Sequence, residues 1–148
     1  MKFAYAAGVA MAICTGQAWA QSRADAAMLK DFKTAGNYIG TIIYQKGMTG
    51  AVDEIETCYA SSKKNRQICF YIDAGAKEYD KGVAAQNNFS THPFFRDDLY
   101  YRRVGKAVNA DSRETNEVIE YVNSVEEVMA NLTVRAVSKL IALSSPTH

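Results

Sequence analysis

Few residues of this 148-residue chain have the types and spacing that acid–base chemistry requires. The chain contains two histidines, His92 and the terminal His148, and histidine is the usual general base near neutral pH. His92 directly follows two hydroxyl residues and precedes Asp97 and Asp98. Because such close neighbours in sequence rarely converge in the geometry of a Ser-His-Asp triad, an enzyme that uses His92 is kept only as an alternative.

Carboxylates also occur in groups, at 53–56, 97–98 and 126–127, and on helices these groups are typical of solvated faces. The sequence has no calcium loop with regularly spaced oxygen ligands and no set of thiols and histidines that would hold zinc. A glycine-rich phosphate loop is absent as well. We therefore predict a protein without catalytic activity, bound metal or cofactor.

The first twenty residues have the pattern of an export signal. Lys2 is followed by an apolar run to Cys14, which is shorter than the roughly 20 residues that span a bilayer. Small residues in Ala18-Trp19-Ala20 mark a cleavage site between Ala20 and Gln21. We expect residues 1–20 to be a cleaved signal peptide and 21–148 a single domain in the periplasm or secreted, with no stable membrane insertion after cleavage. A packed first helix and a retained anchor are the alternatives.

Cleavage would also balance the charge of the chain. The full chain has 17 basic and 16 acidic residues, and loss of Lys2 leaves 16 of each. A balanced chain lacks the positive field that attracts phosphate backbones. Nucleic acid is therefore excluded as an expected partner.

Two cysteines, Cys58 and Cys69, remain once Cys14 is removed. An even number of cysteines in an oxidising compartment predicts a disulfide. The loop that it closes would stabilise the fold by about 3 kcal/mol in the chain-entropy model. Two buried free thiols are the alternative.

Apolar periodicity predicts an all-α fold, a small bundle of about five helices with one disulfide-stapled helical hairpin and a long C-terminal helix. In the first helix Met28, Phe32, Ala35 and Ile39 share one face, and Gly47 is placed to end it. In the third, Gly75 indicates that another helix approaches closely. The expected helices begin near residues 22, 49, 65, 95 and 112, and the first and last end near residues 46 and 143.

The last helix has the clearest pattern. Asp111 and Glu114 resemble a capping box, and an apolar stripe follows through Val118, Val122 and Met129. At 1.5 Å per residue the helix would be roughly 48 Å long. The alternatives for so long a helix in so small a domain are a bend near Asn131-Leu132-Thr133 and an overhang that pairs with a second copy in a homodimer.

Aromatic and arginine side chains cluster in the irregular segment between Gln86 and Asp98 and just after it. Such side chains are enriched at the centres of protein interfaces, so we expect a protein partner. The alternative is that the rings hold a long loop against the core. Lys63, Lys64 and Arg66 form a smaller basic group that is typical of a solvated turn. The candidate partner-binding residues are Phe89, His92, Phe94, Phe95, Arg96 and Tyr100.

One stretch, Cys58 to Asp80, resembles the cysteine-flanked helical hairpin of periplasmic immunity proteins that neutralise type VI secretion amidases. The likeness lies in Cys69-Phe70-Tyr71-Ile72-Asp73-Ala74-Gly75-Ala76, where a cysteine begins a helix that continues with an aromatic, an isoleucine and a small residue. It covers about a sixth of the chain, and the C-terminal cysteine of some members is missing. The resemblance implies binding by surface contact, and no inhibitory residue is carried over.

The leading hypothesis is therefore an exported non-enzymatic binding protein, of the immunity or inhibitor type, that occludes a partner enzyme in the periplasm. A periplasmic stress chaperone or envelope assembly factor is the first alternative. An enzyme that uses His92 and a ligand-binding helical bundle are the others.

Overall fold

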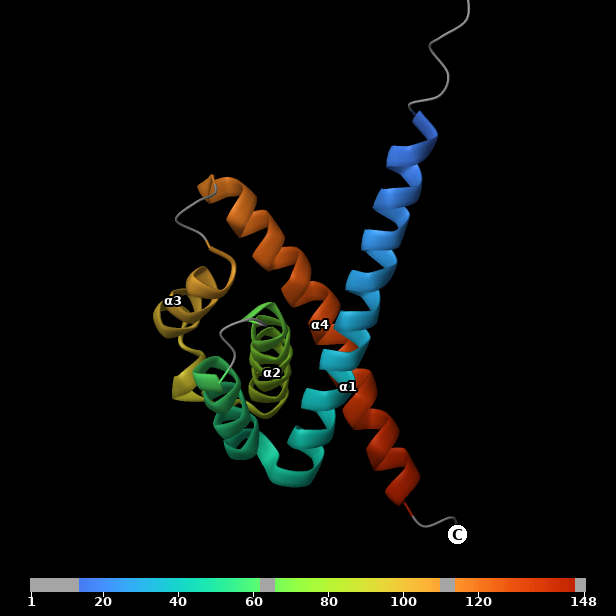
Figure 1. The fold of residues 1–148 in the computed structure, drawn as a ribbon. Coiled ribbons are helices and arrows are strands. Elements are labelled where there is room, and N and C mark those ends of the chain that lie inside the picture. Colours follow the sequence, from blue (N-terminus) through green and yellow to red (C-terminus); the bar gives the residue numbers. More distant parts are fainter. Residues whose placement is uncertain (1–13, 62–65, 110–113, 146–148) are drawn as a thin grey trace, which may run out of the picture. The chain divides into compact units, whose positions relative to one another are not determined.

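The computed structural model describes residues 14–61, 66–109 and 114–145, with side chains from residue 25 onward. All regular structure in these ranges is helical, as the apolar periodicity predicts. The elements are α1 (Cys14–Ser61), α2 (Arg66–Asn87), the short 3-10 helix η1 (Pro93–Phe95), α3 (Asp97–Ala107) and α4 (Thr115–Ser144) (Figure 1).

The number of helices differs from the expected five, since the described residues form four α-helices. The first two expected helices are one element, α1, which is broken at Gly47. Gly47 has φ 68° and ψ −170°, a conformation that suits glycine because it lacks a Cβ. The glycine therefore ends the first stretch of helix, as expected, but the chain resumes helical structure directly after it.

The chain divides into two compact units after Asp31. Of the first unit, residues 14–31 are described, and they are helical. The expected cleavage site between Ala20 and Gln21 falls within this helical stretch, whereas most of the predicted signal peptide, 1–13, lies outside the described residues. The second unit, from Phe32 onward, contains the core and all the contacts discussed below.

The core of the second unit is built from the predicted apolar stripes. Ile39, Ile55, Tyr100 and Met129 are each fully buried and come from α1, α3 and α4. Not every residue of the expected stripes is buried: Met28, the first of its stripe, is 38% exposed, and Val118, the first of the stripe in α4, is half-buried. Periodicity therefore located the buried faces and overestimated their length.

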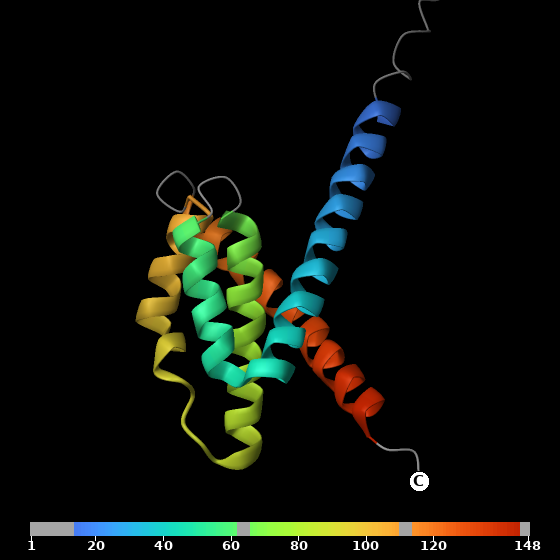
Figure 2. The same ribbon diagram turned by 60° about the horizontal axis from the view of Figure 1, so that its bottom comes forward.

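Helices α1, α2 and α4 approach one another through glycines. A Cβ placed on Gly36 or Gly40 of α1 would lie 2.7 Å from the Cβ of Leu132 or 2.6 Å from that of Ala136 on α4. On α2, a Cβ on Gly75 would lie 2.5 Å from Oγ1 of Thr133. The close approach expected at Gly75 is confirmed, and Figures 1 and 2 show α1 crossing α4.

The Cys58–Cys69 disulfide is present, with a Cα–Cα distance of 5.6 Å, and it joins the end of α1 to the first turns of α2. Helix α4 is continuous over 30 residues. It begins at Thr115 with Glu114 as a cap that makes no side-chain hydrogen bond, so Glu114 does not take the helical place expected of it in a capping box. Asp111 lies outside the described residues.

Candidate partner-binding site

The segment between α2 and α3, residues 88–96, is called the aromatic loop below. It leaves α2 at Asn88, whose φ of 53° turns the chain, and the Phe89 amide donates to the carbonyl of Ala84 over 3.0 Å. Asparagine tolerates this left-handed conformation better than most residues. The direction in which the loop departs is thus set within two residues of the helix end.

The middle of the aromatic loop is attached to α2 by a carboxylate. The His92 amide donates to Oδ2 of Asp80 over 2.7 Å, and Asp80 is buried. A hydrogen bond to a charged acceptor contributes more than one between neutral groups. Asp80 therefore holds a segment that has no regular secondary structure to pair its backbone groups.

His92 then begins η1. Its Nδ1 accepts a hydrogen bond from the Phe94 amide over 3.2 Å, and its carbonyl accepts one from the Phe95 amide over 2.9 Å. Pro93 occupies the first turn, where its missing N–H is not needed. The imidazole also contacts the Phe95 ring at its edge, with 6.1 Å between centroids.

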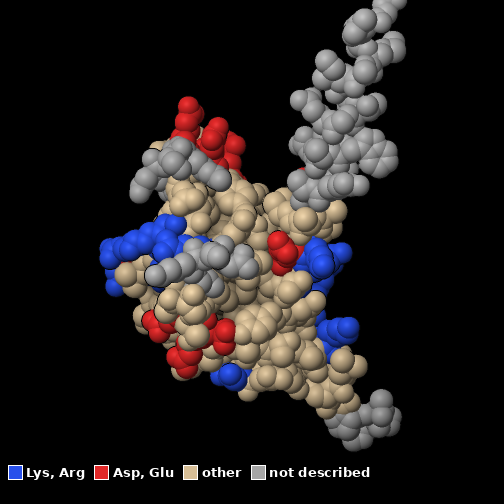
Figure 3. All heavy atoms as spheres, in the orientation of Figure 1, with Lys and Arg blue, Asp and Glu red and all other residues tan. Residues whose placement is uncertain are grey.

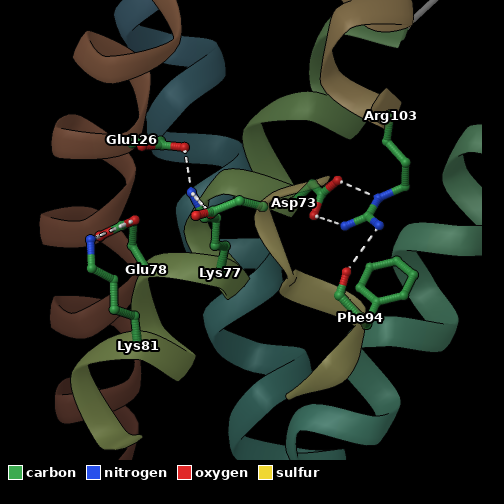
Figure 4. A network of polar contacts seen from close by, with 8 residues as sticks. Asp73, Lys77, Glu78, Lys81, Phe94, Arg103 and Glu126 are labelled. Carbon is green, nitrogen blue, oxygen red and sulfur yellow. Dashed lines mark hydrogen bonds and ion pairs between the residues drawn. The ribbon is translucent and has the colours of Figure 1, made fainter. Parts of the chain in front are cut away.

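The end of the aromatic loop is held by Arg103 of α3. Its guanidinium donates two hydrogen bonds of 3.0 Å to the Asp73 carboxylate and a third, also of 3.0 Å, to the Phe94 carbonyl (Figure 4). It also lies 3.7 Å from the centre of the Phe94 ring. One arginine therefore connects α2, α3 and the loop, with the fork geometry that suits a carboxylate.

A second ion pair lies one turn further along α2. Lys77 is 7% exposed and donates to Oε1 of Glu126 on α4 over 2.9 Å. Its ammonium also lies 4.1 Å from the centre of the Tyr100 ring, a cation–π contact, and 3.7 Å from Oδ1 of Asp97. Lys77 thus joins α2 to both α3 and α4.

The buried groups have shifted pKa values. Burial raises the pKa of Asp73, and the contacts with Arg103 oppose this rise. For Lys77, burial lowers the pKa, but the hydrogen bond to Glu126 and the charges of Glu126, Tyr101 and Glu78 together outweigh burial, and the net shift is upward. Burial raises the pKa of both Tyr59 and Tyr100, so both hydroxyls stay protonated at neutral pH.

The six candidate binding residues fall into three groups. Phe89 is 71% exposed and Arg96 is exposed, where it pairs with Asp98. His92 and Phe94 are half-buried. Phe95 and Tyr100 are 4% and 0% exposed, so these two are corrected from surface residues to core residues. Their rings hold the loop against the core, which is the alternative that the sequence left open.

The surroundings of His92 bear on the catalytic alternative. Nδ1 is used as an acceptor inside η1, and the main chain is bound to Asp80. Within the described ranges, neither Ser90 nor Thr91 makes a side-chain hydrogen bond to His92. In this conformation the local sequence cluster does not form a nucleophile–base pair.

Sequence reasoning missed Asp73, Lys77, Arg103 and Glu126, which carry the polar contacts. A signal was nevertheless present, because Asp73 interrupts the apolar run from Cys69 to Ala76. A carboxylate in the middle of a buried helix face needs a charged partner. The partner itself, Arg103, lies 30 residues away and was identified only by the structure.

Two hollows border this region. A polar cleft of about 460 Å³ lies beside the aromatic loop, and an apolar groove of about 500 Å³ lies between α3 and α4. The cleft includes Lys77, Lys81, Thr91, Asp97 and Glu126. Its cations and carboxylates are mixed, so it has no single charge preference.

Over the described residues, no group of three or more histidine, cysteine, aspartate or glutamate side chains could hold a metal ion. None of the described helices is both long and apolar enough to cross a membrane. Comparison of the chain with known protein families, with curated proteins and with solved structures gives no match.

Proposed function

We propose that this chain is an exported, non-enzymatic binding protein that occludes a protein partner with its aromatic loop. The observation that carries the proposal is the combination of an anchored backbone and an exposed ring. Asp80 and Arg103 hold the loop at His92 and Phe94, while the Phe89 side chain is 71% exposed. A preorganised aromatic residue loses little entropy on binding.

The chemistry of the interior supports a role in binding. The charged side chains behind the loop, Asp73, Lys77, Arg103 and Glu126, are used in ion pairs that hold the fold together. The aromatic loop therefore offers a partner its shape, the Phe89 ring and the Arg96 guanidinium. Aromatic and arginine side chains are the most common centres of binding energy in protein interfaces.

The export signal and the disulfide support the periplasm as the place where this binding occurs. Disulfides persist in oxidising compartments and are rare in reducing ones. Together with the likeness of Cys58 to Asp80 to amidase-immunity proteins, this makes a peptidoglycan amidase the partner class that we propose. Occlusion would then require contact of the loop with the enzyme's groove, without a chemical step.

The proposal is tested by recovering partners from periplasm with the full chain carrying its own leader. Phe89→Ala removes the exposed ring, and Leu143→Ala, at 74% exposure on α4, is the matched control. We expect a specific protein to be retained by wild type and Leu143→Ala, lost with Phe89→Ala, and inhibited as an amidase when bound. Equal recovery by both variants would rule out the loop as the binding site.

A periplasmic chaperone is a second candidate, because apolar side chains are exposed along α4. Ile119, Val134 and Ile141 are 51%, 47% and 52% exposed, and Leu143 is 74% exposed. A chaperone of this kind would suppress aggregation of unrelated proteins and would be weakened by Ile141→Ser. A binding protein that acts through the aromatic loop would be insensitive to Ile141→Ser and sensitive to Phe89→Ala.

The proposed homodimer would use the same helix, since Val134 and Ile141 are seven residues apart and share one face of α4. Sedimentation of the wild type and of a Val134→Ser/Ile141→Ser variant tests the dimer. We expect the wild type to sediment as a dimer and the variant as a monomer. A monomeric wild type would contradict the dimer.

A further inference from the structure

A small cavity lies toward the C-terminal end of α3. Its volume is about 240 Å³. The cavity is bordered by α1, α2 and α3, and four of its six lining residues are cationic while none is acidic. The lining residues are Tyr59, Arg66, Arg102, Arg103, Lys106 and Ala107.

The positive charge of this cavity is only partly neutralised. Arg103 is paired with Asp73, whereas Arg66, Arg102 and Lys106 make no ion pair with any residue in the described ranges. Lys and Arg side chains gather on the surface over α3 (Figure 3). Cations in the last turns of a helix interact favourably with the helix dipole. This does not account for Arg66, which belongs to a different helix and borders the same hollow.

The walls of the cavity are fixed relative to one another. Tyr59 follows Cys58 directly, and Arg66 is three residues before Cys69, so the disulfide ties these two walls together. Arg103, on the third wall, is held by its contacts with Asp73 and Phe94. The cationic side chains therefore surround a preformed space, and their mutual repulsion would be relieved by an anion inside it.

The Tyr59 side chain borders this cavity, and its hydroxyl is buried. It lies close enough to Asp73 for that charge to contribute to its raised pKa, which is due first to burial. It makes no hydrogen bond of good geometry with any described residue. Because the phenol stays protonated, Tyr59 adds no negative charge to the lining.

We propose that this cavity binds the phosphate group of a small anion or of a phospholipid headgroup. Three cations have no carboxylate partner among the described residues, which favours an anion with about two charges over a singly charged carboxylate. Arginine forks also match phosphate oxygens. The cavity has room for one such group. The site shares Arg103 with the anchor of the aromatic loop, but it does not rest on the proposed occlusion.

The experiment is a calorimetric titration of the full chain with inorganic phosphate at constant ionic strength and mildly alkaline pH. We expect saturable binding that is weakened at least about tenfold by Arg66→Gln/Arg102→Gln. Both residues are exposed, so unfolding on substitution is not expected, and circular dichroism verifies the fold. Arg135→Gln, exposed on α4, changes the charge away from the cavity and should leave the affinity unchanged.

A second arm uses vesicles of zwitterionic lipid with and without phosphatidylglycerol, to separate a free phosphate from a headgroup. Binding to the anionic vesicles that is lost in Arg66→Gln/Arg102→Gln but kept in Arg135→Gln identifies the headgroup as the source. The proposal is overturned if neither probe binds saturably. It is also overturned if Arg135→Gln weakens binding as much as the cavity variant, since binding would then follow net charge.

Discussion

The two sides of α2 are packed differently. On one side, Gly75 lies against Ile39, Met129 and Thr133, and the helices meet at distances that exclude even an added methyl group. On the other side, Asp73, Lys77 and Asp80 form directed polar contacts with α3, α4 and the aromatic loop. Close packing fixes where helices lie, while the directed contacts supply partners to a loop whose only regular structure in the described residues is the short helix η1. The polar side is therefore where the shape of the proposed binding surface is set.

Loss of the central polar contact should have the largest effect on stability. Arg103→Met leaves the fully buried Asp73 carboxylate without its cation, and we expect a loss of about 3–5 kcal/mol in the free energy of unfolding. Urea denaturation measures this loss. Asp73→Ala/Arg103→Met removes the orphaned charge as well, so the double variant should be more stable than Arg103→Met alone. A single variant within about 0.5 kcal/mol of wild type would contradict this role of the pair.

The same variant has a predicted pH dependence. Arg103 lowers the pKa of Asp73, so its removal raises that pKa further above the unfolded value of about 3.9. When the pKa of a carboxyl group is higher in the folded than in the unfolded state, the free energy of unfolding falls as pH increases from the unfolded pKa to the folded one. The deficit of Arg103→Met relative to wild type should thus be largest at neutral pH and should shrink in acid. A deficit that does not change with pH would exclude an orphaned Asp73 charge as its cause.

Removal of the disulfide should have the next largest effect. Cys58→Ser/Cys69→Ser opens a loop with a sequence separation of 11, and we expect a loss of about 3 kcal/mol. Thermal unfolding with and without reductant measures the effect. Reductant should destabilise wild type and leave the serine variant unchanged; an equal effect on both would point to a cause other than this bond.

The crossing of α1 and α4 at Gly36 and Gly40 should be destabilised by a single added methyl group. Gly40→Ala places a Cβ 2.6 Å from that of Ala136, and we expect a loss of about 1–3 kcal/mol from overpacking. Gly82→Ala on α2 is the matched control, because nothing lies within 4 Å of its added Cβ. That variant should gain about 0.5–1 kcal/mol from helix propensity. If both alanine variants are stabilised, the crossing is looser than described.

The smallest effect on stability is expected for an exposed hydrogen bond within α1. Tyr38 donates to Glu54 across the break at Gly47, and this hydrogen bond raises the pKa of Tyr38 to about 12. The raised pKa means that the contact stabilises the fold below the ordinary tyrosine pKa and is lost as pH increases toward about 12. The difference in ultraviolet absorbance between wild type and Tyr38→Phe should show this late titration, and Glu54→Gln should move it back toward the ordinary value.

The apolar side could be predicted from the sequence to a large extent. Periodicity identified Phe32, Ile39 and Met129 as buried, and the mid-helix Gly75 indicated a close approach. The two cysteines that remain after the expected loss of Cys14 predicted the disulfide. These features depend on spacing within one helix or on composition, both of which a single sequence contains. The merger of two expected helices across Gly47 was missed because glycine at that point permits both a stop and a sharp bend.

The polar side could be predicted only in part. The aromatic residues of the loop were recognised, but two of the candidate partner-binding residues, Phe95 and Tyr100, are buried in the core. Asp73 and Arg103 meet because α2 and α3 pack together, and no local pattern connects residues so distant in the chain. Directed contacts between elements require the relative placement of those elements, which periodicity does not supply.

Amide hydrogen exchange at His92 tests the central claim, that buried polar groups hold the aromatic loop in one conformation. The His92 amide donates to the buried Asp80 carboxylate over 2.7 Å. We predict strong protection of this amide in wild type and its loss in Asp80→Ala, while the amides of α4 keep their protection in both. Exchange of the His92 amide at the rate of an open chain in wild type would contradict the claim.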